Sequence, residues 1–210
     1  YWGRTTAPCF VAGTDSNRID VIDSNPFCGS LPNNSIVIPL NNFGWYFFGT
    51  NIIPINTSTD KVLSPIAGSY EVIQSYLNGV VKQYNPANPP ILNTLKNLSY
   101  LNGYWLKVKS TPANDLLIVG NKVTGCHPLT LGITPVNQHW IGYWVDRTQP
   151  TATALSSLAG NYSLVRTYEN GVWKTYNSSL PQFSDLLEMK PGQSYLIKMT
   201  NQDNLDYICG

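Results

Sequence analysis

The sequence predicts a mainly β fold with a few short helices, arranged as two tandem homologous modules behind a short N-terminal extension. Three observations lead to this prediction: an internal repeat, apolar and aromatic segments of strand length, and an Asn-Gly pair at the equivalent place in each repeat. Each module is expected to be a small sandwich or barrel. We expect the extension at 1–32, the first module at 33–124 and the second at 125–210.

The internal repeat is clearest around the two Asn-Gly pairs. Residues 67–85 read AGSYEVIQSYLNGVVKQYN, and residues 159–177 read AGNYSLVRTYENGVWKTYN. The alanine, the glycine, three tyrosines, Asn-Gly, a valine, a lysine and the final asparagine fall in register. The match extends upstream, where residues 48–49 align with 141–142, and downstream, where residues 104–108 align with 195–199. The two copies therefore predict one fold formed twice.

Each copy predicts the same order of strands. Apolar and aromatic residues at 36–48, and their counterparts at 129–141, predict the first strands. A hairpin follows, because Asn-Gly is the preferred pair for a type I′ turn, in which both central residues adopt positive φ. The turns are expected at Asn78-Gly79 and Asn170-Gly171, and the closing strands at 104–108 and 195–199.

Short helical elements are expected between these strands. Thr59-Asp60 and Thr151 have side chains suited to capping a helical turn. A second short helix is expected at 92–98 in the first copy and at 184–189 in the second.

The four cysteines favour an oxidising compartment. They form no C-x-x-C pair, and an even number in a charge-poor chain suggests two disulfides. Of three pairings, we favour Cys9–Cys28, which would staple the extension, and Cys126–Cys209, which would join the ends of the second copy. The alternative is four buried free thiols in a cytosolic protein.

No metal or cofactor is expected. Cys126, His127 and Cys209 could hold zinc with one further ligand, but a disulfide accounts for both cysteines. The oxygen-rich segment 15–25 could bind calcium, yet it lacks the glycine and the closing glutamate of an EF-hand loop. A polar, turn-rich loop is the favoured interpretation.

The composition argues against several kinds of partner. Charged residues make up 12% of the chain and the net charge is +1, so little field exists to gather nucleic acid or anionic lipid. No apolar run reaches the roughly 18 residues of a membrane-spanning helix, so no membrane insertion is expected. Hydrophobic residues make up 42%, which suffices for a packed core. The neutral polar surface permits close self-association.

The sequence also carries no recognisable catalytic motif. His127 and His139 lack H-E-x-x-H neighbours, and neither G-x-S-x-G nor a glycine-rich phosphate loop occurs. Two of the twelve acids could still meet in a cleft, as in glycoside hydrolases, but the acids are scattered and the repeats share almost none. We therefore expect that the protein is not an enzyme.

The aromatic residues allow two interpretations. Six tryptophans and 13 tyrosines could form flat platforms for sugar rings, or they could pack between strands. Trp105 and Trp140 are expected in the core. The candidate glycan-stacking residues are Trp144, Trp173, Tyr76, Tyr84, Tyr168 and Tyr176.

Each copy carries short motifs at the ends of its strands. The first copy has Asn-Pro at 85–86 and Gly-Tyr-Trp-Leu-Lys at 103–107, and the second has Ile-Gly-Tyr at 141–143. This pattern resembles a module of exported and cell-surface proteins of bacteria and archaea, with a Gly-Trp-Asn-Leu-Ile-Gly strand and a Gly-Lys-Gly-Tyr-Trp-Ile-Lys ending. The second copy departs from it, with Gln-His at 138–139 and Asn-Ser at 177–178. The resemblance spans most of residues 40–110 and 137–200, and implies an extracytoplasmic, often tandem accessory module without a catalytic role.

Together these features predict a non-enzymatic extracellular structural or adhesive protein. It would be a surface-layer, filament or appendage subunit or an adhesin module, located outside the cell or on its surface. Its expected partners are further copies of itself or other surface proteins. The alternative is a pair of carbohydrate-binding modules, with a polysaccharide as the ligand.

Overall fold

The structure is a computed structural model that describes residues 34–110, 114–125 and 127–207. The described residues belong to one compact unit. The extension at 1–32, the segment 15–25 and all four cysteines (Cys9, Cys28, Cys126 and Cys209) lie outside the described residues. The disulfide, zinc and calcium hypotheses that rest on them therefore stay predictions.

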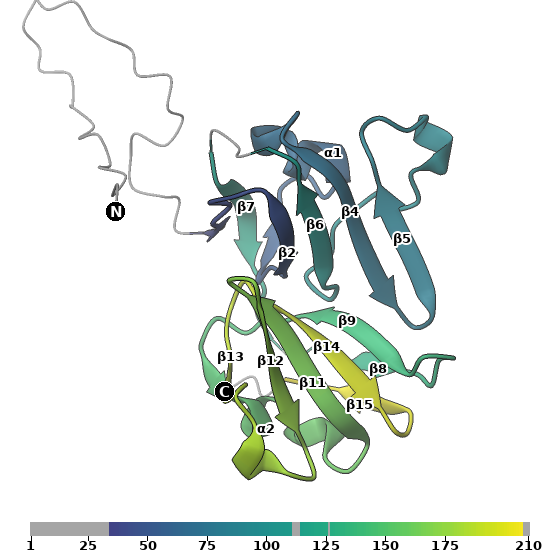
Figure 1. Ribbon diagram of the computed structural model, residues 1–210, viewed down its shortest axis with the longest axis vertical. Coiled ribbons are helices and arrows are strands. Elements are labelled where there is room, and N and C mark those ends of the chain that lie inside the picture. The colour runs from purple at the N-terminus through teal and green to yellow at the C-terminus, as the bar shows by residue number, and fades with distance from the viewer. Residues whose placement is uncertain (1–33, 111–113, 126, 208–210) are drawn as a thin grey trace, which may run out of the picture. The chain divides into compact units, whose positions relative to one another are not determined.

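The described residues are mainly β, as predicted, and two four-stranded antiparallel sheets dominate them (Figure 1). The first sheet has the order β2-β6-β4-β5 and the second the order β12-β11-β14-β9. The strands of the first sheet are β2 (Gly44–Phe48), β4 (Tyr70–Leu77), β5 (Val80–Tyr84) and β6 (Tyr104–Val108). Those of the second are β9 (Gln138–Gly142), β11 (Tyr162–Glu169), β12 (Val172–Asn177) and β14 (Ser194–Met199).

The two sheets share one topology. In each, the hairpin strands lie at one edge, the closing strand pairs with the first hairpin strand, and the earliest strand forms the other edge. Both also carry an irregularity at the same place, between Tyr70 and Val72 in the first sheet and between Tyr162 and Leu164 in the second. A bulge of this kind bends the strand locally. The shared topology supports two modules of common origin, and the boundary at 124/125 stays a prediction.

Both hairpin turns form where the Asn-Gly pairs predict them. Asn78 and Gly79 have φ angles of 49° and 81°, and Asn170 and Gly171 have 53° and 84°. Positive φ at both central residues defines a type I′ turn, whose twist matches that of the flanking strands. The two predicted hairpins are confirmed.

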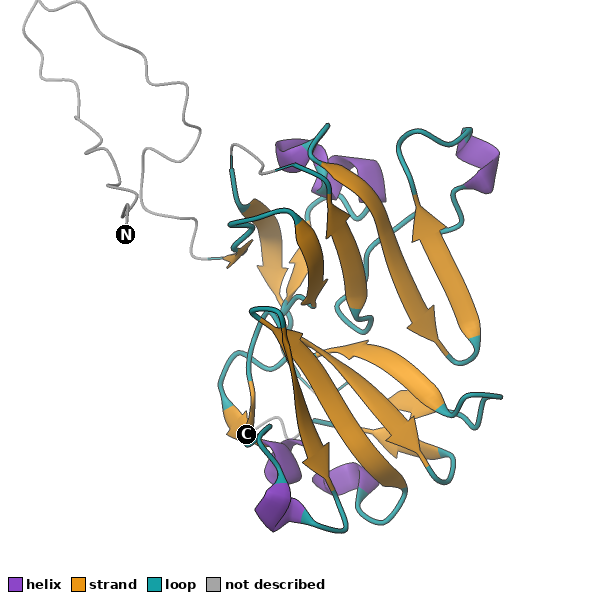
Figure 2. Cartoon of the chain, viewed as in Figure 1, coloured by secondary structure: helices purple, strands orange, loops and turns teal. Residues whose placement is uncertain are grey.

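Smaller elements complete each half. Figure 2 shows the helical segments of the two halves at opposite ends of the described unit. No helix within the described ranges is long and apolar enough to cross a membrane. The remaining strands form the sheets β1-β7-β3, β15-β8 and β10-β13: β1 (Ser35–Ile38), β3 (Ile52–Pro54), β7 (Leu116–Lys122), β8 (Leu129–Leu131), β10 (Gln149–Pro150), β13 (Glu188–Met189) and β15 (Asp203–Leu205). The helices are α1 (Thr59–Val62) and α2 (Thr151–Ala154), with 3-10 turns at Ser64–Ile66, Pro90–Leu92, Ser156–Leu158 and Pro181–Phe183.

The capping role expected of two threonines is wrong. Thr59 and Thr151 are the first residues of α1 and α2, not their caps. Their buried hydroxyls instead donate to the carbonyl oxygens of Leu95 and Leu186, at 2.9 Å in both halves. Each threonine therefore ties its helix to the loop that follows the hairpin.

The helices expected at 92–98 and 184–189 do not form. In the first half the Leu95 N–H donates to the Gln83 carbonyl of the hairpin at 2.8 Å, and in the second the Leu186 N–H donates to Thr175 at 3.1 Å. Backbone groups that a helix would bond internally are thus used to hold the loop on the edge of the sheet.

Each large sheet covers an apolar core with one face, and a smaller sheet covers the other side. The first core joins Phe48, Ile73 and Leu106 of the large sheet to Ile38 and Leu116 of the small one. The second core has the same layers, with Ile141, Val165 and Ile197 facing Leu131 and Leu205.

Candidate functional site

The outward faces of the two large sheets meet in a cluster of aromatic side chains. Phe47 stacks on Trp105 with ring centroids 4.7 Å apart, and it meets Trp140 edge-on at 6.2 Å. Such pairs stabilise a contact by about 0.5–1.5 kcal/mol beyond the area they bury. We call the interface between the two halves the joint. Its aromatic cluster, the aromatic joint, consists of Trp45, Phe47, Tyr76, Trp105, Trp140, Tyr168 and Trp173.

The expectation that Trp105 and Trp140 lie in a core is wrong. Both are half-buried and lie in the joint, on the opposite face of their strands from the cores. Successive side chains of a strand point to opposite faces, so Tyr104 enters the first core while Trp105 turns outward. The sheets are therefore apolar on both faces.

The pairing across the joint is reciprocal. Phe48 forms a bridge with Gln193, and Ile141 forms a bridge with Asn102. By the register of the repeat, Ile141 is equivalent to Phe48 and Asn102 is equivalent to Gln193. Reciprocal contacts between equivalent residues define a two-fold interface. The described unit thus has an internal pseudo-two-fold axis at the joint.

Backbone hydrogen bonds obey the same symmetry. The Gly49 N–H donates to the Gly192 carbonyl at 3.0 Å, and the equivalent Gly142 N–H donates to the Leu101 carbonyl at 3.1 Å. These bonds bring the two halves to backbone contact at the centre of the joint.

The first hairpin turn is attached to the second half by three hydrogen bonds. The Asn78 N–H donates to His139 Nδ1 at 3.1 Å, and the Asn78 amide donates to the Thr130 carbonyl at 3.0 Å. Asn78 Oδ1 accepts from the Gly132 N–H, also at 3.0 Å. His139 Nε2 lies 2.8 Å from the Gly132 carbonyl, so the ring carries its proton on Nε2 and accepts at Nδ1.

This attachment makes the stability of the protein depend on pH through His139. Burial lowers the pKa of His139 from its ordinary value, and a protonated Nδ1 would face the Asn78 N–H. Below about pH 6.5 the unfolded state then binds more protons than the folded state, so the free energy of unfolding falls as the pH drops. Urea denaturation between pH 5 and 8 should show this slope, and it should flatten in His139→Gln. An unchanged slope in that variant would contradict the assignment.

The second hairpin turn lacks an equivalent attachment. In the described part of the chain, no hydrogen bond holds the side chain of Asn170. The register of the repeat explains this, because two of the three groups that hold Asn78 have no functional counterpart in the first half. Thr130, Gly132 and His139 correspond to Val37, Pro39 and Tyr46.

Two of these replacements remove hydrogen-bonding groups. Pro39 has no N–H to offer where Gly132 donates to Asn78. Tyr46 replaces His139, and its hydroxyl is already bonded to the backbone N–H and carbonyl of Asn42, at 2.9 and 2.8 Å. The joint is therefore closed at one turn and open at the other.

Substitution of glycine for Asn78 or for Asn170 should lower the free energy of unfolding by different amounts. Asn78→Gly keeps positive φ accessible but removes two side-chain hydrogen bonds, so we expect a loss of about 1–2 kcal/mol in the free energy of unfolding. Asn170→Gly removes no hydrogen bond and should be close to neutral. Urea denaturation of both variants measures the difference, and equal losses would count against an asymmetric joint.

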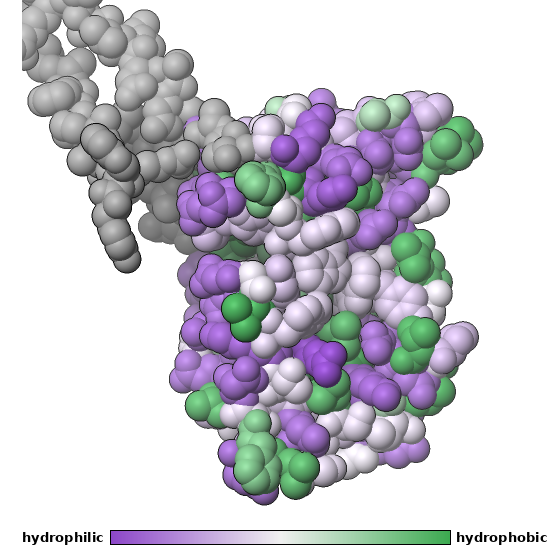
Figure 3. All heavy atoms as spheres, viewed as in Figure 1, coloured by the Kyte–Doolittle hydropathy of each residue, from purple (hydrophilic) through white to green (hydrophobic). Residues whose placement is uncertain are grey.

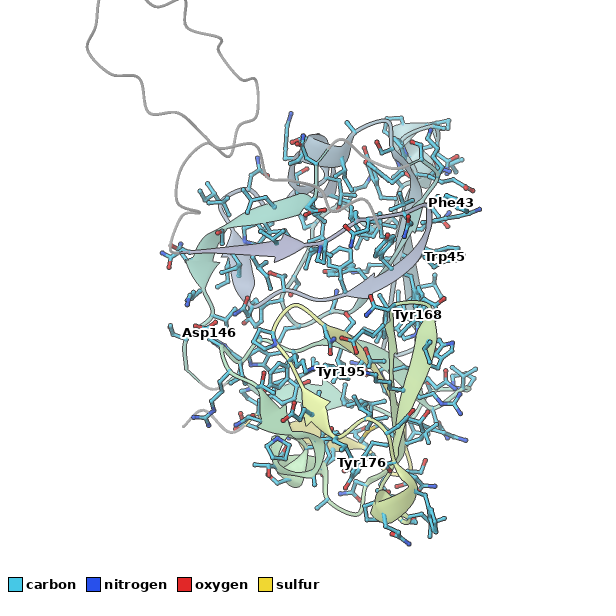
Figure 4. The ribbon with its side chains drawn as sticks, turned by 60° about the vertical axis from the view of Figure 1, so that its left-hand side comes forward. Phe43, Trp45, Asp146, Tyr168, Tyr176 and Tyr195 are labelled. Carbon is cyan, nitrogen blue, oxygen red and sulfur yellow. The ribbon has the colours of Figure 1, made fainter. Side chains whose placement is uncertain are left out.

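A groove of about 610 Å³ lies beside the open turn. Its walls come from residues 36–48 on one side and from Tyr168–Gly171 and 191–193 on the other. Its volume falls in the range of about 300–1,000 Å³ that is usual for small-molecule sites. Figure 4 shows Phe43, Trp45 and Tyr168, which all line the groove, along one side of the described unit.

The lining of the groove is aromatic and neutral polar. Phe43 is 77% exposed and Trp45 is 42% exposed. Among the described residues that line it, Glu169 alone carries a charge. Glu169 accepts hydrogen bonds from Lys174 Nζ at 2.6 Å and from Gln193 Nε2 at 2.9 Å. The bond from Lys174 lowers the pKa of Glu169, so the acid is ionised and already paired.

The candidate stacking residues lie in three environments. Trp144 is 1% exposed in the second core, so its proposed role as a stacking platform is wrong. Tyr84 and Tyr176 are half-buried and pack against the two cores. The other three, Tyr76, Tyr168 and Trp173, belong to the aromatic joint, where Trp173 is 42% exposed.

The sequence did not single out the two most accessible aromatic residues of the groove: Phe43 was not considered, and Trp45 was included only among the six tryptophans in general. A signal was present, since Asn41-Asn42-Phe43-Gly44 is a turn-like segment that contains an aromatic residue. An aromatic side chain on a tight loop has little around it to cover its ring. Within the described ranges, no group of three or more His, Cys, Asp or Glu side chains could hold a metal ion.

Comparison with known proteins found no matching family model, no matching curated protein and no matching solved structure. The resemblance to modules of exported and cell-surface proteins therefore stays a prediction.

Proposed function

We propose that this chain is a non-enzymatic protein of the cell exterior with a structural or adhesive role, either as a subunit of a surface layer, filament or appendage or as an adhesin module. The groove carries this proposal, because exposed aromatic rings and neutral amides on a β frame suit contact with a partner. The visible face of the described unit is largely hydrophilic, with small, separate hydrophobic groups (Figure 3).

Several side chains of the types used in catalysis form hydrogen bonds that hold the fold. Both ring nitrogens of His139 bond to the backbone. Asp115 accepts from the Leu40 N–H at 2.9 Å, and Asp185 accepts from the Thr175 N–H at 2.6 Å. These attachments favour a binding role over a catalytic one for this unit.

The hairpin edges of the large sheets, β5 and β12, favour contact through side chains over strand pairing between copies. On β5, the Gln83 N–H donates to Thr94 Oγ1 at 3.0 Å, and its carbonyl accepts from Leu95. On β12, Thr175 is covered in the same way by Asp185. Covered edges resist the addition of a further strand. Partners are therefore expected at the loops and the groove.

The adhesive function is tested by incubating the labelled protein with cell envelopes of its source organism. Saturable adsorption, or ordered assemblies seen by electron microscopy of the purified protein, would support the proposal. A protein that neither adsorbs nor assembles at high concentration would contradict it.

A second candidate function, a carbohydrate-binding pair of modules, is favoured by one specific observation. Phe43 and Trp45 present exposed aromatic rings at a groove that also contains neutral amides. Aromatic rings combined with a few placed polar groups are typical of sites that bind polar organic ligands. Retarded migration in gels that contain a polysaccharide would support this function.

A further inference from the structure

We propose that the groove is a binding site for a neutral saccharide, formed because the pseudo-two-fold joint is closed at the first hairpin turn and open at the second. The inference rests on the proposed binding function and names its site and its ligand class.

The open space is the counterpart of a filled contact. In the first half of the joint, Asn78 occupies the position beside Thr130 and Gly132 and bonds to both. At the second hairpin turn, Pro39 and Tyr46 of the first half offer Asn170 no partner, and the groove lies between the segment 36–48 and Tyr168–Gly171. The side-chain amide of Asn78 is thus hydrogen-bonded within the chain, whereas the equivalent amide of Asn170 is available to a ligand.

The groups left over are amides and aromatic faces. In the described part of the chain, no hydrogen bond involves the side-chain amides of Asn41, Asn42 and Asn170, and all three residues line the groove. Each amide presents a donor and an acceptor side by side, which complements neighbouring hydroxyl groups of a sugar. Trp45 and Phe43 add exposed rings against which the apolar face of a sugar can lie.

The charge of the groove favours a neutral ligand. Glu169 is held by Lys174 and Gln193, so the pair Glu169–Lys174 has no net charge. An anionic ligand would meet an ionised carboxylate, and a cationic one would compete with Lys174 for it.

One wall of the groove is held in place by hydrogen bonds within the chain. The loop that carries Phe43 is closed by the bonds of Tyr46 to Asn42, and Asp115 holds the Leu40 N–H beside it. A preformed wall lowers the entropy lost on binding.

Affinity electrophoresis tests the site, with gels that contain a β-glucan, a xylan, a mannan or a galactan. We expect the wild-type protein to be retarded by at least one of the four. For that polysaccharide, Trp45→Ala and Phe43→Ala should each weaken binding at least tenfold. The matched control is Phe183→Ala, because Phe183 is 81% exposed but does not line the groove. Thermal unfolding verifies that every variant is folded.

A second readout locates the ligand within the fold. With ¹⁵N-labelled tryptophan, an oligosaccharide of the retarding polymer should shift the indole signal of Trp45 and leave that of the buried Trp144 unchanged. Asn170→Gly should weaken binding by a fewfold, because it removes a groove amide. Asn78→Gly should not, because Asn78 is outside the groove.

Three outcomes would overturn the proposal. One is no retardation of the wild-type protein in any of the four gels. Another is retardation that persists unchanged in Trp45→Ala and Phe43→Ala, which would leave carbohydrate binding in place and move it elsewhere. The third is adsorption to cell envelopes that is lost in Trp45→Ala but not competed by the saccharides, which would assign the groove to a protein partner and leave the adhesive function standing.

Discussion

Replacing Gly142 with alanine is expected to destabilise the protein by about 3 kcal/mol, the upper end of the usual range for overpacking. A Cβ at this position would lie 2.3 Å from the Tyr100 carbonyl oxygen and 3.0 Å from that of Asn102. Both atoms belong to backbone that crosses the joint, so no flexible side chain can move aside. The substitution would separate the two halves where their backbones touch.

Gly132 offers a matched control for this substitution. A Cβ at Gly132 would have its nearest neighbours at 3.8 and 3.9 Å, which is ordinary contact, and its hydrogen bond to Asn78 would remain. Gly132→Ala should therefore change the free energy of unfolding by less than about 1 kcal/mol. Urea denaturation at a constant m-value measures both variants. Equal effects of the two substitutions would show that close backbone contact at Gly142 is not what stabilises the joint.

Trp144→Ala is expected to cost about 3–5 kcal/mol, the range for removing a large buried aromatic side chain. The ring of Trp144 meets Tyr207 with centroids 4.3 Å apart and Tyr100 at 6.0 Å. Its indole N–H finds no hydrogen-bond partner within the described residues, so the loss is one of packing. Trp144→Phe should be much milder, because it keeps a ring and removes the unpaired N–H.

Trp173→Ala is the comparison for Trp144, because Trp173 is 42% exposed in the joint. It should lose about 1 kcal/mol, in proportion to the smaller area it buries. The midpoints of thermal unfolding of the two variants measure the contrast. A Trp144→Ala protein as stable as Trp173→Ala would contradict the burial of Trp144 in the second core.

Local chemistry explains which parts of the fold could be predicted from the sequence. Asn78-Gly79 and Asn170-Gly171 specify their turns through their own backbone preferences, without help from the rest of the chain. Because the two halves are copies of one repeat, a secondary-structure element predicted correctly in one half is also predicted in the other. The helices expected at 92–98 and 184–189 failed because the groups that bond these segments lie on the distant hairpin edge.

Tertiary contacts explain why the exposure of the tryptophans could not be predicted. Trp45 and Phe47 alternate with Tyr46 and Phe48, so aromatic residues point to both faces of β2. The alternation does not indicate which face of β2 packs on the core and which face contacts the other half. The same reason separates Trp144, buried in a core, from Trp45, exposed at the groove.

The only sequence signal for the groove is a set of differences between the two repeats. Pro39 stands where the second copy has Gly132, and Tyr46 stands where it has His139. These differences acquire meaning once the joint is known, because they decide which turn finds hydrogen-bond partners.

Amide hydrogen exchange at the two turns tests the asymmetric joint most directly. The Asn78 backbone N–H is bonded to His139 Nδ1, whereas within the described residues no hydrogen bond attaches the Asn170 backbone N–H to the other half. We expect the protection factor of the Asn78 amide to exceed that of the Asn170 amide at least tenfold, with the two turns otherwise alike. Equal protection at Asn78 and Asn170 would contradict a joint that is closed at one turn and open at the other.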